Sequence, residues 1–227
     1  MNKYTNNIDM ECAFLLDQIR DEVRDTGYMT GRAALTKQVF QAIKQVPRHE
    51  FVPAALQHQA YANHPLPIRH GQTISQPYIV ALMTELIQPE AEDMVLEIGT
   101  GSGYQAAILS RLVKQVYSLE IVETLAEQAR ERLARLGYEN VEVRTGNGHF
   151  GWPEHAPYDS ILVTAAAPQI PPALIEQLKP GGTLVIPVGN AFSGQELRVV
   201  TKDAQGQIEQ RTALPVIFVP MIGEPPI

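Results

Sequence analysis

Three glycines at alternate positions, placed directly after an apolar run of strand length, constrain the fold of this chain more than any other feature. The run is Val95–Ile98, the glycines are Gly99, Gly101 and Gly103, and a helix-like segment, Gln105–Val113, follows them. In doubly wound α/β domains, a strand, a glycine-rich turn and a helix in this order build the nucleotide pocket at the carboxyl end of the first strand. Glycine permits the sharp turn and leaves bare backbone against which a ligand can lie.

Two acidic residues indicate which ligand the loop would take. Glu97 precedes the first glycine, which gives E-x-G-x-G-x-G instead of the G-x-G-x-x-G of dinucleotide enzymes. A carboxylate there would repel a pyrophosphate but suits a ligand that carries an ammonium and a sulfonium group. Glu120 ends the next apolar run, where an acid can accept both hydroxyls of a ribose; this weighs against a glycine turn without a ligand. The pattern resembles motif I of the S-adenosylmethionine-dependent methyltransferases.

Composition and charge exclude several classes of protein. The chain has 227 residues, enough for one well-buried domain with a small appendage, and its net charge of −7 disfavours nonspecific nucleic-acid binding. Its apolar runs are too short for a membrane span, and Met1–Asp9 is too polar for a signal peptide. Cys12 is the single cysteine, so neither an internal disulfide nor a thiolate metal site is expected. We therefore expect a cytoplasmic protein that contacts neither nucleic acid nor membrane and holds no metal.

The first 90 residues are predicted to form a helical and loop-rich cap on a sheet domain. Apolar residues recur at helical spacing over 10–23, with Gly27 expected to end that helix, and again over 35–43 before Pro47. A third amphipathic helix follows Pro77. On the residues alone, Ser75 is best interpreted as the N-cap of this third helix, with the proline in its first turn.

Residues 91–227 are predicted to form a doubly wound α/β domain with a mostly parallel sheet, a Rossmann-like fold. Strands are expected at 94–98, 115–119, 141–145, 158–163 and 183–188, and the helices between them at 105–113, 123–136 and 171–178. Two further strands at 197–202 and 208–214 flank a turn, which predicts a C-terminal β-hairpin at one edge of the sheet.

The end of the fourth predicted strand indicates the class of acceptor. Thr164–Pro168 contains small residues and no titratable group. An amine acceptor would want a base there to remove a proton, whereas a carboxylate acceptor is already ionised near neutral pH. The chain also lacks the G-x-S-x-G and P-loop motifs, and its six histidines lack helical zinc-site spacing.

Residues 46–223 resemble the protein-L-isoaspartate O-methyltransferases. The matching motifs before and in the glycine loop are V-P-R with F-V-P (46–53), G-Q-T-I-S-Q-P (71–77) and the loop itself (97–103). Those after it are Y-S-L-E-I (117–121), G-W-P (151–153), T-A-A-A-P (164–168) and F-V-P (218–220). T-I-S-Q-P is the most specific of them. The resemblance implies a repair enzyme that moves a methyl group from S-adenosylmethionine to the α-carboxyl of isoaspartyl residues in damaged proteins and peptides. Residues 91–227 would then be the cofactor-binding domain.

The resemblance also implies roles for single residues. Ser75 would orient the substrate carboxylate as the catalytic residue, and this role displaces the N-cap as its favoured interpretation. Substrate contacts would come from Thr73, Ile74, Ser75 and Val219. The cofactor would be held by Glu97, Gly99, Thr100, Gly101, Ser102, Gly103, Glu120, Ile121, Asn147 and Gly148, from its methionine end through the ribose to the adenine.

Two departures from the family pattern and three alternatives stay open. Asn147 stands where the family usually has an aspartate; an amide oxygen can still accept from the adenine amino group, with lower expected affinity. Arg69 and His70 make the residues before Gly71 bulkier and more basic than expected. The alternatives are a methyltransferase of the same fold with a small-molecule acceptor, a nicotinamide-dependent oxidoreductase, and a noncatalytic cofactor-binding protein. A monomer is expected.

Overall fold

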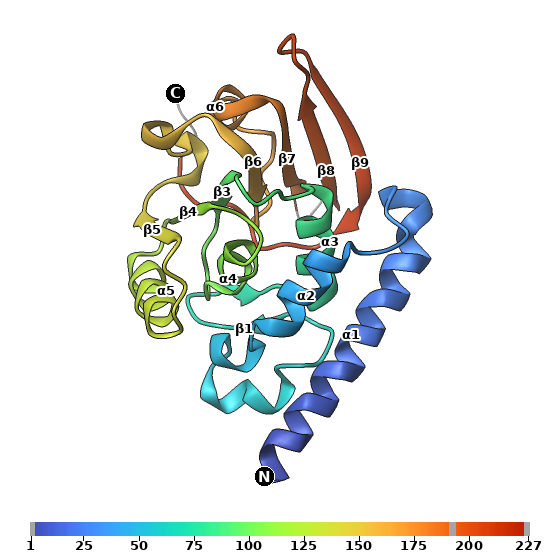
Figure 1. Cartoon of the computed structure of the whole chain (residues 1–227). Helices are drawn as coiled ribbons and strands as arrows, with labels where there is room; N and C mark the ends of the chain where they lie inside the picture. Colours follow the sequence, from blue (N-terminus) through green and yellow to red (C-terminus); the bar gives the residue numbers. More distant parts are fainter. Residues whose placement is uncertain (1–2, 191–193, 225–227) are drawn as a thin grey trace.

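A computed structural model of the chain describes residues 3–190 and 194–224 (Figure 1). Its α-helices are α1 (Lys3–Thr30), α2 (Lys37–Gln45), α3 (Pro77–Leu86), α4 (Tyr104–Ser110), α5 (Glu123–Arg135) and α6 (Pro172–Gln177). Its strands are β1 (Leu66–Pro67), β2 (Thr73–Ile74), β3 (Met94–Ile98), β4 (Gln115–Glu120), β5 (Val141–Thr145), β6 (Tyr158–Val163), β7 (Leu178–Asn190), β8 (Gly194–Lys202) and β9 (Ile208–Val216). Short 3-10 helices are η1 (Arg48–Phe51), η2 (Ala54–Gln59), η3 (Gly148–Phe150) and η4 (Pro153–His155).

Seven strands form one sheet in the order β5-β4-β3-β6-β7-β8-β9. The first five of these are parallel, and β8 and β9 extend the sheet as an antiparallel hairpin. The predicted doubly wound, mostly parallel α/β fold with a C-terminal hairpin is confirmed. The strand order reverses between β3 and β6, because the chain returns from the edge strand β5 to form β6 beside β3. Ligands of such sheets lie outside the carboxyl ends of the strands at this point.

Apolar side chains pack on both faces of the sheet, because successive residues of a strand point to opposite sides. Val95 and Leu96 of β3 are both fully buried yet belong to different clusters. The first cluster joins the sheet to α1–α5 and the second joins it to α6 and to the segment around Trp152. Burial on both faces explains why the central strands are almost continuously apolar in sequence.

The segment before β3 contributes to the same core as the sheet. Ile19 of α1, Ile43 of α2 and Leu82 of α3 are buried in the cluster that contains Val95 and Val116. Between α2 and α3 the chain makes η1, η2 and the two-stranded hairpin β1–β2. A division of the chain near residue 90 stays a prediction.

Gly27 does not end the first helix, contrary to the prediction. Helix α1 continues to Thr30, and the left-handed residue that ends it is Gly31, whose φ is +72° and whose N–H donates to the Gly27 carbonyl at 3.0 Å. A side chain at Gly27 would bring its Cβ within 2.9 Å of the Ala33 Cα. Gly27 therefore permits close packing inside a helix, a role that local sequence does not distinguish from a helix stop.

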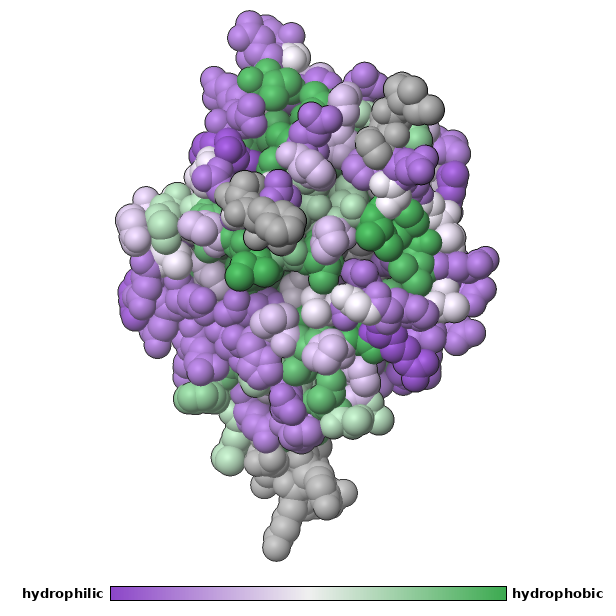
Figure 2. All heavy atoms as spheres, turned by 180° about the vertical axis from the view of Figure 1, so that it is seen from behind, coloured by the Kyte–Doolittle hydropathy of each residue, from purple (hydrophilic) through white to green (hydrophobic). Residues whose placement is uncertain are grey.

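Hydrophilic residues cover most of the rear face of the molecule (Figure 2). Figure 2 shows the face turned away from the viewer in Figure 1, where hydrophobic residues form separate patches between hydrophilic ones. Among the helices that the structure describes, none is long and apolar enough to span a membrane.

Candidate functional site

A narrow cavity lies at the carboxyl ends of β3, β4 and β6, where the chain crosses between the halves of the sheet. It is lined by Gln72, Thr73, Ile98, Gly99, Gly101, Leu119, Glu120, Ile121, Gly148, Thr164, Ala165, Val219, Pro220, Met221 and Ile222. We call it the loop cavity. Seven of the predicted site residues line it: Thr73, Gly99, Gly101, Glu120, Ile121, Gly148 and Val219.

The glycine loop owes its shape to its neighbours on β4 and β6. The amide N–H groups of Gly99 and Thr100 both donate to the Leu119 carbonyl, at 2.8 and 3.2 Å. Thr164 donates its hydroxyl to the Gly99 carbonyl at 2.6 Å. A Cβ at Gly99 would collide with that hydroxyl, and the φ of +96° at Gly99 is unfavourable for any other residue. The first glycine is thus required by the fold, whatever the loop binds.

Glu120, the last residue of β4 and the predicted ribose ligand, links that strand to the glycine loop. One carboxylate oxygen accepts from the Gly101 N–H at 2.8 Å and the other from the Val122 N–H at 3.0 Å. The side chain lines the loop cavity while only 6% of the residue is exposed. Each oxygen retains a lone pair for a further donor, so the group can brace the loop and also accept from a hydroxyl.

Glu97 is buried behind the loop and does not line the loop cavity. Its Oε2 accepts from the Ser118 hydroxyl at 2.5 Å, and Ser118 also contacts the Thr100 hydroxyl at 2.6 Å. Its Oε1 has no hydrogen-bond partner among the described residues. Complete burial raises the pKa of Glu97 to about 8, an effect that the Ser118 hydrogen bond opposes and the nearby Glu120 charge increases. The predicted contact of Glu97 with the cofactor stays a prediction.

Asn147 uses both ends of its side chain within the protein. Its Oδ1 accepts from the His149 N–H at 3.0 Å, which caps η3, and its Nδ2 donates to the Glu224 carbonyl at 2.8 Å. The side chain thus joins η3 to the segment after β9.

Three further residues of the predicted set, Thr100, Ser102 and Gly103, lie in the glycine loop but outside the lining of the loop cavity. Their predicted cofactor contacts stay predictions.

Ser75 lies between β2 and α3 and is not an N-cap. The cap position of α3 is Gln76, which makes no side-chain capping bond. The N–H of Tyr78 donates instead to Asn63 Oδ1 at 3.0 Å, so a residue distant in sequence satisfies the helix start. The hydroxyl of Ser75 has no hydrogen-bond partner among the described residues, and its carbonyl accepts from Arg48. The N-cap interpretation was wrong because local sequence does not reveal Asn63.

A second cavity, of about 580 Å³, is lined by Ser75 and shares Thr73 with the lining of the loop cavity. Its lining includes Thr73, Ser75, Tyr78 and Phe218. Thr73 lines both cavities, and Phe218 of the second is followed directly by Val219 of the first. Ile74, by contrast, is buried in the core at 3% exposure and lines neither cavity. Thr73 and the segment after β9 therefore form the junction between the two spaces.

Arg48 is a buried residue of the site that sequence analysis did not single out. Its Nε donates to the Ala60 carbonyl at 2.9 Å and its Nη2 to the Ser75 carbonyl at 2.8 Å. The guanidinium lies 4.8 Å from the ring of Tyr104, the first residue of α4. Burial lowers the pKa of Arg48. The one signal in the sequence is its place in the V-P-R motif, which does not show what the side chain contacts.

The segment 219–222 also lines the loop cavity, and residue patterns in the sequence do not predict that it does. The N–H of Ala166 donates to the Val219 carbonyl at 2.8 Å, and the N–H of Met221 donates to the Ala166 carbonyl at 2.7 Å. These bonds fasten the segment across the end of β6 and leave the loop cavity only about 50 Å³. Glu120 is the one titratable side chain among the described residues of its lining. The described residues also contain no group of three His, Cys, Asp or Glu that could hold a metal ion.

Comparison with known proteins gives one consistent family. Residues 21–225 match the protein-L-isoaspartate(D-aspartate) O-methyltransferase family. A Syntrophobacter fumaroxidans protein named protein-L-isoaspartate O-methyltransferase 2 is 58% identical over 93% of this chain and 85% of its own length. A Polaromonas protein of the same name is 57% identical over 92% of this chain and 100% of its own length.

Two solved structures share the fold. One, a protein-L-isoaspartate O-methyltransferase, superposes with a TM-score of 0.79 at 28% identity and covers 92% of this chain and 66% of that chain. The other is a Plasmodium falciparum protein described as a putative protein-L-isoaspartate O-methyltransferase in complex with S-adenosyl-L-homocysteine. It has a TM-score of 0.74 at 24% identity over 90% of this chain and 97% of that chain, and it supports the fold.

Proposed function

The chain belongs to the protein-L-isoaspartate(D-aspartate) O-methyltransferase family, and from this premise we propose that it methylates the α-carboxyl of isoaspartyl residues in damaged proteins and peptides. The observation that carries the proposal is that Thr73 lines both cavities. One cavity has the glycine loop and Glu120 in its wall, and the other has the free hydroxyl of Ser75. A methyl donor and a carboxylate acceptor would meet there.

The residues of the loop cavity fit S-adenosylmethionine in chemistry. Glu120 offers carboxylate lone pairs for ribose hydroxyls, and the apolar side chains of Ile98, Leu119 and Ile121 suit the faces of an adenine. Gly101 has a φ of +53° and no side chain, so its bare backbone faces Ile68, next to the hairpin β1–β2. When bound, the cofactor supplies an electrophilic methyl group on its sulfonium sulfur.

The chain's own contribution is to bind and orient the acceptor. Ser75 can donate its hydroxyl to one oxygen of the substrate carboxylate and so direct the other oxygen toward the loop cavity. No base is required, because a carboxylate is ionised near neutral pH, and Thr164 and Ala165 at the strand end supply none. Catalysis would then rest on positioning and on exclusion of water.

Location and oligomeric state are part of the proposal. A cytoplasmic protein is supported by the single cysteine, Cys12, which fits a reducing compartment. A monomer stays the expected oligomeric state. Light scattering on the purified protein measures the mass directly; a dimer at micromolar concentration contradicts the second statement.

Transfer of a labelled methyl group from S-adenosylmethionine tests the proposal. An isoaspartyl peptide should accept the label, and the otherwise identical aspartyl peptide should not. Transfer only to small carboxylic acids would favour the small-molecule alternative. Binding of NAD in place of S-adenosylmethionine would favour an oxidoreductase. Binding of the methyl donor without transfer to any acceptor would indicate a noncatalytic protein.

A further inference from the structure

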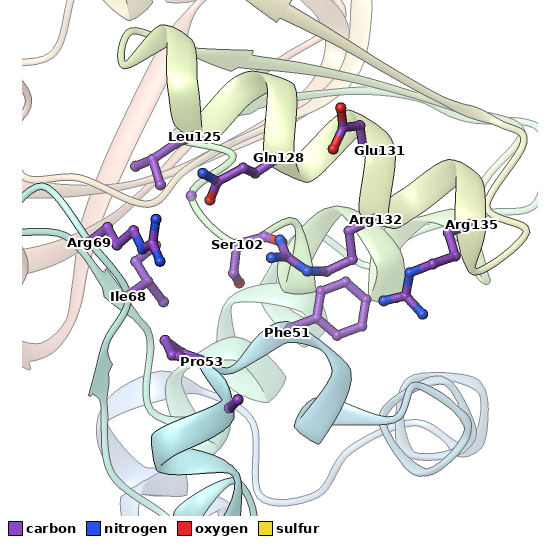
Figure 3. Close-up of a pocket in the computed structure, with 12 residues that line it drawn as sticks. Phe51, Pro53, Ile68, Arg69, Ser102, Leu125, Gln128, Glu131, Arg132 and Arg135 are labelled. Atoms are coloured by element: carbon purple, nitrogen blue, oxygen red, sulfur yellow. The ribbon is translucent and has the colours of Figure 1, made fainter.

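A third cavity, of about 430 Å³, lies on the outer side of the glycine loop (Figure 3). Its walls come from η1 and η2, from the tip of the hairpin β1–β2, from the loop itself and from α5. We call it the arginine cavity, because Arg69, Arg132 and Arg135 line it. The chain as a whole carries a net charge of −7, so three arginines around one cavity do not reflect a generally basic surface.

Two of these guanidinium groups face each other without an acid between them. Figure 3 shows Arg69 reaching in from the hairpin tip and Arg132 from α5, with Ser102 between them. Arg69 is exposed, and its guanidinium makes no hydrogen bond or ion pair with any described residue. Arg132 is partly buried; its Nη1 donates to the Ser102 carbonyl at 2.8 Å, and its other N–H groups are available. Like charges that converge on an open space repel each other unless an anion lies between them.

The nearby acids do not neutralise this pair. Glu50 is bonded to Arg135 at 2.9 Å, so those two charges compensate each other. Glu131 also lines the cavity and is exposed, and among the described residues no ion pair joins it to Arg69 or Arg132. Burial lowers the pKa of Arg132, the neighbouring Arg135 charge lowers it further, and the Glu50 charge opposes both effects.

The position of the cavity indicates what kind of anion it would receive. Gly101 lines both the arginine cavity and the loop cavity, and Arg69 lies four positions before Thr73 in the hairpin that leads to Ser75. Phe51, Ile68 and Leu125 add apolar surface that suits the methylene stem of a side chain. A peptide whose isoaspartyl residue lies at Ser75 can therefore place a neighbouring side chain on the other side of the hairpin tip.

We propose that the arginine cavity is a specificity site that binds the carboxylate of an Asp or Glu side chain near the isoaspartyl residue of the substrate. The inference rests on the proposed function, because it concerns the same substrate. Arg69 and Arg132 would together provide charge-assisted hydrogen bonds to the planar carboxylate. Isoaspartyl sites in acidic segments of proteins would then be preferred over the same sites in neutral segments.

The test compares isoaspartyl peptides that carry Glu or Gln at one position within about four residues of the modified site, since an extended chain advances about 3.3–3.6 Å per residue. The readout is the ratio of kcat/KM for the Glu peptide to that for its Gln twin. At one position or more the wild-type ratio should be about five to ten. Arg69→Gln should reduce this ratio to about one, and Arg69→Glu should instead favour a peptide with Lys at the same position. Raised salt should lower the wild-type ratio.

Arg130→Gln is the matched control, because Arg130 lies on the same helix as Arg132 but outside the lining of the cavity. It should retain the wild-type ratio. A wild-type ratio near one at every position, or an unchanged ratio in Arg69→Gln, would overturn the specificity site while leaving the proposed function intact. Failure to methylate any isoaspartyl peptide, neutral or acidic, would overturn the proposed function and this inference together.

Discussion

At the scale of single residues, Ser75 gives the sharpest prediction about turnover. Ser75→Ala should lower kcat/KM for an isoaspartyl peptide by about tenfold to a thousandfold, because an unpaired hydroxyl that orients a carboxylate is lost. The melting temperature should stay unchanged, since Ser75 does not cap α3.

Asn63→Ala provides the matching contrast. This change leaves the Tyr78 N–H without its acceptor and removes the amide hydrogen bond to Glu22, so it should lower the stability by at least about 1 kcal/mol, the usual cost of losing a helix cap. Thermal unfolding and peptide kinetics of both variants are the measurements. A Ser75→Ala variant with a lower melting temperature and normal kinetics would return Ser75 to a structural role.

Glu97 gives a prediction about pH. Its pKa of about 8 in the folded protein exceeds the ordinary 4.5, so the folded state holds this proton more tightly than the unfolded state does. The contribution of Glu97 to stability is therefore greatest below pH 4.5 and is lost as the pH rises through 8, by at most about 1.4 kcal/mol per pH unit. Glu97→Gln removes the ionisation and retains an oxygen for the Ser118 hydroxyl. In urea unfolding from pH 5 to 8.5, the free energy of unfolding of the variant should rise relative to that of the wild type as the pH rises.

The control for Glu97 is Glu142→Gln, which replaces an exposed carboxylate on β5. Parallel stability curves for the wild type and Glu97→Gln across this pH range would show that Glu97 ionises in the fold as readily as in the unfolded chain. The assignment of a buried, protonated Glu97 would then be wrong.

At the scale of elements, the segment after β9 is held by few bonds, and Asn147 supplies one of them. Asn147→Asp keeps an oxygen that caps η3 but replaces the donor to the Glu224 carbonyl with a negatively charged acceptor. The segment 219–224 should therefore open more easily. Loss of one hydrogen bond of about 0.5–1.5 kcal/mol corresponds to roughly two- to tenfold faster hydrogen exchange of its amides.

Asn147→Ser separates the two parts of this effect, because a serine oxygen can cap η3 without a negative charge. It should accelerate exchange less than Asn147→Asp does. Unchanged exchange in both variants would contradict the role of Asn147 in fastening the segment, and a tighter cofactor complex in Asn147→Asp would support the predicted contact with adenine.

The elements that sequence predicts well are those whose signal is local. The strand before the glycine loop, α5 and β5 follow from short-range periodicity and from glycines at their ends, and the structure places them as expected. The start of α3 was predicted at Pro77, but the acceptor that satisfies the Tyr78 N–H could not be, because Asn63 comes from a separate segment. For the same reason, the pairing of Arg48 with the Ala60 and Ser75 carbonyls has no signature in any one window of sequence.

At the scale of the whole molecule, the wall of the loop cavity was predicted more fully than the surroundings of Ser75. Gly99, Gly101 and Glu120 belong to one unit of β3, glycine loop, α4 and β4, so their sequence spacing fixes their meeting. The surroundings of Ser75 join the hairpin β1–β2, the segment after β9 and Arg48, which only tertiary packing brings together. Family resemblance supplied Ser75 and Val219, and residue patterns alone did not.

The shared core predicts how the molecule unfolds. Apolar residues of α1–α3 and of the central strands belong to one cluster, so the N-terminal segment and the sheet should lose structure in one cooperative transition. Trp152, the only tryptophan, is buried in the cluster on the opposite face and reports on the sheet, whereas far-ultraviolet circular dichroism is dominated by the helices. Urea curves from the two signals should coincide.

Arg48→Met tests this cooperativity, because the hydrogen bonds that it removes lie within the first 90 residues. Met retains apolar bulk beside Tyr104 but donates to neither the Ala60 nor the Ser75 carbonyl, so two buried acceptors lose their partner. Both urea curves should shift to lower concentration by the same amount and remain superimposed. A shift of the circular dichroism curve alone, without the Trp152 curve, would show that the first 90 residues unfold independently. Separate curves in the wild type would show the same. In either case the boundary near residue 90 is a true domain boundary. A common shift with an unchanged slope would instead show that Arg48 stabilises one folding unit, since the slope reports the surface exposed in a single transition.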